Sequence, residues 1–262
     1  MTKRNQSEED RSSRDLMAIV FAMIFPTIVT LVYFQWLKDS DSSLQQIAFG
    51  IGKTIQFGFP ALWVWLWHRE RIRRLIGESP GSETNGSDVS PTPASSRFAI
   101  LIGIGFGLIV VGGMFVMYFL MIANTNVAPE LSEMVQEKVS DMELNSFWRF
   151  VAMGIFYALC HSFLEEYYWR WFVFDMLQKF VSAPTAMIVS SLGFMAHHVI
   201  LLGFFFKWQW MTYPLSLCIA IGGMFWAWQY QQSGKLRASW ISHMIVDAGI
   251  FLLGYFIVKS IL

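Results

Sequence analysis

The sequence predicts an all-α fold, a polytopic transmembrane helical bundle with about seven membrane-spanning helices and bounds of six to eight. Hydrophobic residues make up 55% of the 262 residues and aromatic residues 17%, whereas only 15% are charged. Apolar runs close to the ~20 residues that a helix needs to cross the hydrocarbon core recur along the chain. Composition and run length together indicate an integral membrane protein.

Seven apolar runs follow one another and are the candidate spans. They cover residues 16–36, 46–67, 98–122, 147–172, 184–206, 211–228 and 240–261. The first run follows a short N-terminal tail, residues 1–15, and is too long for the apolar region of a cleaved signal peptide. The second is interrupted by Lys53 and Gln56, which could line a cavity, and Lys53 could instead extend towards the membrane surface.

Two segments between the runs differ in composition from the spans. Residues 77–97 are rich in Ser, Gly, Pro and Thr, which predicts a disordered cytoplasmic linker. This linker separates transmembrane helices 1 and 2, in residues 16–76, from a larger transmembrane unit in residues 98–262. Residues 129–144 place apolar side chains near one helical face, which predicts a short amphipathic helix at the outer surface.

The basic residues outside the spans predict the orientation. Lys and Arg gather in the N-terminal tail, in residues 69–74 and in residues 233–239, and are sparse in the alternate loops. We therefore expect an integral protein of the plasma (inner) membrane with a cytoplasmic N-terminus. The 19 basic and 19 acidic residues balance, so charge gives no reason to expect a nucleic-acid partner. The lipid bilayer is the expected surrounding.

Two adjacent carboxylates and an arginine lie inside the fourth apolar run. An ionisable residue at membrane depth is costly, so its presence is by default a hypothesis of a functional site. On a helix, Glu166 and Arg170 are four residues apart and share one face, in the favourable order for an ion pair. Glu165 points about 100° away. We therefore expect Arg170 to neutralise Glu166, and Glu165 to be free to hold or move a proton.

Further polar residues lie in the later runs. If the fourth and fifth runs form a hairpin that turns near residues 181–183, the Glu pair and His197 with His198 reach a similar depth. His243 and Asp247 in the last run are four residues apart and share a helical face. We expect His198 and His243 to join the carboxylates, and interpret His161 and His197 as packed histidines that hydrogen-bond to neighbouring groups.

A carboxylate beside a neutral imidazole can activate water, and a second histidine can stabilise the oxyanion that forms when water attacks a carbonyl. No Ser or Cys lies in a pattern typical of a covalent nucleophile, which favours direct attack by water. A divalent metal such as zinc is the alternative, with Glu165, His198, His243 and Asp247 as candidate ligands. The residues alone do not choose between these two chemistries.

Three motifs carry a resemblance to a known family: Glu-Glu-x-x-x-Arg at Glu165, Glu166 and Arg170, Phe-x-x-x-His at Phe194 and His198, and His-x-x-x-Asp at His243 and Asp247. In this order, on three spans, they resemble the CPBP family of CAAX proteases and bacteriocin-processing enzymes, also called Abi. The resemblance covers the C-terminal part of the chain. Residues 1–145 are similar only in being membrane spans.

The resemblance implies an intramembrane endopeptidase whose active site opens to the cytoplasmic leaflet. It implies that Glu165 and His198 activate water and that His243 stabilises the oxyanion, with no cofactor. The prenyl-protein branch of the family has Asn where this chain has Asp247. An ionised Asp would repel an oxyanion, so Asp247 is expected to be protonated, to bind a metal or to orient His243.

The expected function is hydrolysis of a peptide bond in a membrane-associated protein or peptide by glutamate- and histidine-activated water, in a catalytic core formed by residues 98–262. Two alternatives from other classes are a non-catalytic membrane scaffold or immunity protein, and a proton-coupled transporter that uses the same residues as a relay. Intact motifs argue against the scaffold. The lack of visible internal repeats argues against the transporter.

Overall fold

The computed structural model describes residues 3–68 and 93–262, and within these ranges every regular element is a helix. The α-helices are α1 (Lys3–Leu31), α2 (Ser42–Trp67), α4 (Pro93–Met117), α5 (Val127–Asp141), α6 (Phe147–Phe156), α7 (Ser162–Glu166), α8 (Asp175–Leu177), α9 (Ala183–Phe205), α10 (Thr212–Ser233) and α11 (Leu236–Val258). The π-helical segments are η1 (Val32–Trp36), η2 (Tyr118–Ile122), η3 (Tyr157–His161) and η4 (Tyr167–Phe174).

Six helices in the described residues are long and apolar enough to cross a membrane, which confirms the predicted helical membrane bundle. They comprise Asp10–Trp36, Ser42–Trp67, Arg97–Ile122, Phe147–Leu177, Ala183–Phe205 and Leu236–Val258. The seventh expected span, residues 211–228, lies in α10. This helix has 22 residues and packs against α9 and α11. Polar residues such as Gln229 lower its mean hydropathy, so it is not among the six helices that are apolar enough to cross a membrane.

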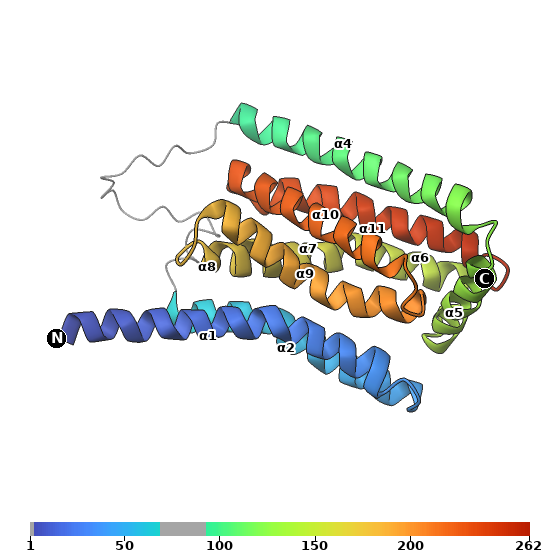
Figure 1. Ribbon diagram of the computed structural model, residues 1–262, viewed down its shortest axis with the longest axis horizontal. Coiled ribbons are helices and arrows are strands. Elements are labelled where there is room, and N and C mark those ends of the chain that lie inside the picture. The colour runs from blue at the N-terminus through green and yellow to red at the C-terminus, as the bar shows by residue number, and fades with distance from the viewer. Residues whose placement is uncertain (1–2, 69–92) are drawn as a thin grey trace.

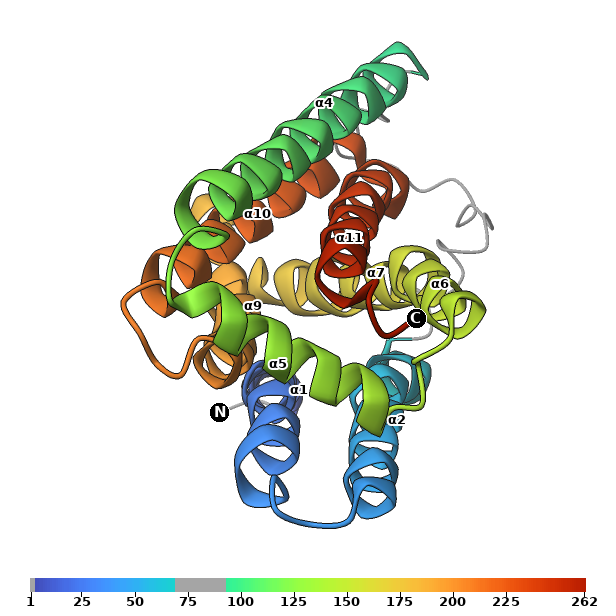
Figure 2. The ribbon, with the colours of Figure 1, turned by 90° about the vertical axis from the view of Figure 1, so that its right-hand side faces the viewer.

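The helices run roughly along one axis and form a bundle (Figure 1). Helices α1 and α2 lie side by side on one side of it, and α4, which packs on α11, lies on the other. The segment from α6 to α8 runs between these two sides (Figure 1). Figure 2 shows α5 crossing the end of the bundle, as expected of the amphipathic segment, with Leu131 and Val139 buried.

The turns of the bundle follow local sequence signals. Ser182 directly precedes α9 in an extended conformation and Pro184 lies in the first turn, where its missing N–H costs no helical hydrogen bond. This confirms the turn expected near residues 181–183. Helix α10 ends at Gly234, whose φ of 62° is a left-handed conformation that glycine adopts without steric cost.

A small residue allows α9 and α10 to pack closely. A Cβ added to Gly223 of α10 would lie 3.1 Å from the Cβ of Ser191 in α9. Small residues bring helix backbones together in membranes, where van der Waals packing drives association. This contact holds α9, the helix of His197 and His198, in place.

The expected linker, residues 77–97, lies mostly outside the described residues. Its last five residues belong to α4, which begins at Pro93, so the boundary at residue 97 is too late. Proline at the start of a helix is favourable because its fixed φ suits the first turn.

The expected N-terminal tail, residues 1–15, contributes to the fold, since α1 begins at Lys3. Its last residue, Asp15, is buried, with Oδ1 2.7 Å from His68 Nε2 and Oδ2 2.7 Å from Lys179 Nζ. These contacts connect α1 to the end of α2 and to the turn between α8 and α9.

Candidate active site

The two adjacent glutamates lie in a single α-helical turn between two π-helical segments. Helix α7 contains Glu165 and Glu166, η3 precedes it directly and η4 follows it directly. Short π segments inside helices occur frequently at functional sites. The wider turns change which side chains of this span face the neighbouring helices, while α7 keeps both carboxylates inside the bundle.

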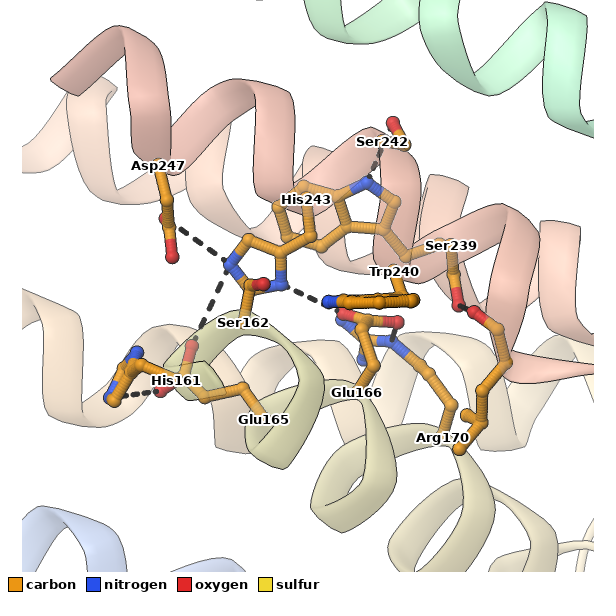
Figure 3. A network of polar contacts seen from close by, with 12 residues as sticks. His161, Ser162, Glu165, Glu166, Arg170, Ser239, Trp240, Ser242, His243 and Asp247 are labelled. Atoms are coloured by element: carbon orange, nitrogen blue, oxygen red, sulfur yellow. Dashed lines mark hydrogen bonds and ion pairs between the residues drawn. The ribbon is translucent and has the colours of Figure 1, made fainter. Parts of the chain in front are cut away.

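Glu166 bridges a cation and an imidazole. Its Oε2 accepts from Arg170 Nε at 3.2 Å and its Oε1 lies 3.0 Å from His243 Nδ1 (Figure 3). Both Glu166 and Arg170 are 0% exposed, which makes this a fully desolvated ion pair. The pairing expected from helical spacing is therefore present, and the contact to His243 joins the first motif to the third.

Aromatic rings complete the surroundings of Arg170 and His243. The Arg170 guanidinium lies 5.3 Å from the Phe194 ring centre and 5.7 Å from that of Trp226. Trp226 stacks on His243 with ring centres 4.0 Å apart, and its Nε1 donates to Ser242 Oγ at 3.1 Å. Phe194 and Trp226 thus pack against the Arg170 cation, and Trp226 also fixes the plane of the His243 imidazole.

Glu165 faces three imidazoles and is 2% exposed. Its Oε1 lies 3.7 Å from His161 Nε2 and 3.7 Å from His197 Nε2, and its Oε2 lies 3.7 Å from His243 Nε2. These separations are longer than a hydrogen bond. They are suited to a water molecule that bridges the carboxylate and an imidazole.

The two neighbouring histidines of α9 differ in their hydrogen bonding. The Nδ1 of His198 lies 2.9 Å from the Phe194 carbonyl oxygen, so it carries the proton and leaves Nε2 as an acceptor. His197 stacks on Trp169 at 4°, with ring centres 5.9 Å apart. Neither ring nitrogen of His197 has a hydrogen-bond partner among the described residues. Both imidazoles can therefore interact with a water molecule held by Glu165.

Asp247 lies beside His243 on α11. Its Oδ1 is 3.5 Å from His243 Nε2, and its buried Oδ2 has no hydrogen-bond partner in the described part of the chain. Because Glu166 holds Nδ1 of His243, Asp247 and Glu165 share the opposite nitrogen, Nε2. An imidazole proton on Nε2 would therefore face two carboxylates.

The structure gathers the residues predicted from the sequence and adds two more. It brings together Glu165, Glu166, Arg170, Phe194, His198, His243 and Asp247. The added residues are His161 and His197, which sequence analysis interpreted as packed histidines. A signal for His161 was its position four residues before Glu165, the same spacing as between Glu166 and Arg170.

A compact set of metal-ligating atoms also differs from the set proposed from the sequence. Ligand atoms of Glu165, His197 and His198 all lie within 4.8 Å of one another. His243 and Asp247, the other two candidates, approach Glu165 from α11 and contact each other. A carboxylate with two imidazoles is a reasonable donor set for zinc.

Residues 147–249 match the family model described as Rce1-like, type II CAAX prenyl endopeptidase. The matched range contains all three motifs together with His161 and His197. Searches against curated proteins and solved structures gave no match. The family match confirms the resemblance that the motifs carry: residues 147–249 are similar to the Rce1-like type of CAAX protease within the CPBP family.

Proposed function

We propose that the chain is an intramembrane endopeptidase that hydrolyses a peptide bond in a membrane-associated protein or peptide. The observation that carries the proposal is the buried Glu165 carboxylate, faced by three imidazole nitrogens at 3.7 Å. A carboxylate and imidazoles in a confined site can activate water. The Rce1-like family match supports this class of reaction.

In the proposed reaction, Glu165 takes a proton from water while Nε2 of His198 accepts a hydrogen bond from the same molecule. The water oxygen forms a bond to the carbonyl carbon of the scissile peptide. The carbonyl electron pair moves to oxygen and gives a tetrahedral oxyanion. When the intermediate collapses, the C–N bond breaks and the proton held by Glu165 passes to the leaving nitrogen, which yields a new carboxyl end and a new amine.

His243 is the proposed neighbour of the oxyanion, because Glu166 holds its Nδ1 and its Nε2 points towards Glu165. Asp247 orients the same ring through Nε2. An ionised carboxylate at this place repels the oxyanion, so a second source of positive charge is required nearby.

The proposal requires no metal. Zinc is the alternative, and the residues that fit it best are Glu165, His197 and His198, with His243 and Asp247 close by. A zinc ion would polarise the scissile carbonyl and acidify its bound water. Chelation distinguishes the two versions.

We also propose that the site faces the cytoplasmic half of the plasma membrane. The support is the concentration of Lys and Arg in the N-terminal segment and in residues 233–239, next to the start of α11. A substrate would then reach Glu165 from the cytoplasmic leaflet.

The experiment that tests the function compares protein termini in membranes of cells that produce either the wild-type chain or Glu165→Gln. Quantitative mass spectrometry of new N-termini should show a set of cleavage products that is present with the wild type and lost with the variant. Glu137→Gln, at an exposed position on α5, is the matched control and should keep the products. Identical termini in all three samples would contradict the proposal and leave a non-catalytic scaffold.

A further inference from the structure

Helix α2 carries a lysine inside its membrane span, outside the region that the family model matches. Lys53 lies in the middle of the span Ser42–Trp67. An ammonium at membrane depth is costly unless a partner neutralises it. Among the described residues, no carboxylate oxygen lies within 4.0 Å of the Lys53 ammonium.

The Lys53 ammonium lies near two aromatic rings of its own helix. It lies 5.4 Å from the ring centre of Phe49 and 5.4 Å from that of Phe57, one turn before and one turn after it. The Phe57 ring packs edge-on against His161, with ring centres 6.1 Å apart. Aromatic faces attract the ammonium but do not neutralise its charge.

The contact between Phe57 and His161 places Lys53 on the α2 side of Glu165, whereas His243 contacts Glu165 from α11. In both ribbon views α7 lies between α2 and α11 (Figures 1 and 2). The site therefore has a cation, Lys53, on its α2 side and a carboxylate, Asp247, on its α11 side.

The α11 side of the site, which carries Asp247, is poorly suited to binding an oxyanion. Asp247 lies 3.5 Å from His243 Nε2, and an ionised carboxylate can only accept hydrogen bonds. Arg170 is already paired with Glu166 at 3.2 Å. Of the cations that the structure describes around Glu165, Lys53 is the one that no carboxylate pairs with.

We propose that Lys53 is a catalytic residue whose ammonium donates a hydrogen bond to the oxyanion of the scissile carbonyl, on the α2 side of the site. The inference rests on the proposed function. Lys53 transfers no proton: as water adds, the carbonyl electron pair moves to oxygen beside the ammonium, and it returns when the C–N bond breaks. The positive charge offsets the repulsion from Asp247 as the oxyanion forms.

The test uses the purified full chain in lipid–detergent micelles and a set of internally quenched peptides with an N-terminal palmitoyl chain as the probe. Lys53→Met should lower kcat by about 10² to 10³, the loss typical of removing one oxyanion donor. KM should change little, because the interaction forms only in the transition state. Lys53→Arg, which keeps a cationic donor, should retain most of the activity.

A double-mutant cycle with Asp247→Asn makes the test specific. The Asn amide can itself donate to the oxyanion, so Lys53→Met should cost no more than about tenfold in the Asp247→Asn background. Equal losses in both backgrounds, an effect confined to KM, or full activity of Lys53→Met would overturn the proposal. Lys259→Met is the matched control, since Lys259 also lies over a ring, Phe256 at 5.9 Å, at the far end of α11.

A binding measurement separates failure of this inference from failure of the proposed function. A peptide phosphonate carries a tetrahedral anion, and it should raise the unfolding temperature of the wild type but not that of Lys53→Met. If Glu165→Gln abolishes cleavage while Lys53→Met is fully active and still binds the phosphonate, only the role of Lys53 is wrong. If Glu165→Gln does not affect cleavage, the proposed function is wrong and this inference is wrong with it.

Discussion

Replacement of Glu166 tests the division of roles between the two adjacent glutamates. Glu166→Gln removes the charge that neutralises Arg170, and both side chains are 0% exposed. Breaking one partner of a buried pair costs about 3–5 kcal/mol, because the other charge is left uncompensated. The expected result is a markedly less stable protein.

The size of the effect on thermal unfolding follows from this energy. One kcal/mol shifts the unfolding midpoint by about 2–4 °C in a chain of 150–250 residues, so Glu166→Gln should lower it by about 6–20 °C. Arg170→Ala should have at least as large an effect, because it also removes the contacts of the guanidinium with Phe194 and Trp226. Glu165→Gln should lower the midpoint less than Glu166→Gln does, since its three imidazole contacts at 3.7 Å are longer than a hydrogen bond.

The assay is tryptophan fluorescence of the detergent-solubilised protein during heating, which the 12 tryptophans make sensitive. The yield of monodisperse protein after membrane extraction provides an independent readout. Glu137→Gln on α5 is the control for an exposed substitution. The reasoning is refuted if Glu166→Gln unfolds at the wild-type temperature, or if Glu165→Gln is the less stable of the two.

Three further predictions concern the site and its surroundings. His198→Ala should lower turnover by about 10² to 10⁴. The double variant with Glu165→Gln should be little worse than either single variant, because the effects of residues that act as a unit are not additive. An inactive His197→Ala beside an active His198→Ala would assign the contact with the attacking water to His197 instead. Activity of the purified protein should survive strong chelation, whereas loss of activity with rescue by zinc would establish the metal version. With Cys160 and Cys218 replaced, a cysteine at Ser182 or Lys235 should not react with a membrane-impermeant maleimide added to intact cells, and labelling of either from outside would show the opposite orientation.

The fold was predictable because it depends on run lengths and local turn signals. Apolar runs set the spans within a few residues, and Ser182 with Pro184 predicted the start of α9. The start of α4 was placed too late because the polar residues 93–97 resemble a linker in composition, although Pro93 is a helix-start signal.

The site was predictable where its contacts are local. Helical spacing gave the Glu166–Arg170 pair correctly, since both residues lie on consecutive turns. It could not give the contact between Glu166 and His243, which joins residues 77 apart in sequence. The proximity of His161 and His197 to Glu165 also depends on helix rotation at the π segments and on packing against Trp169, which no periodicity in the sequence records.

The most direct test of the central claim is the turnover of purified Glu165→Gln beside that of purified Glu166→Gln, each normalised to folded protein. Gln preserves the shape of Glu165 but cannot accept the proton from water. The account predicts that folded Glu165→Gln loses turnover by about 10² to 10⁴, as expected for a missing general base, while the folded fraction of Glu166→Gln remains active. Near-normal cleavage by Glu165→Gln together with a well-folded and inactive Glu166→Gln would contradict it.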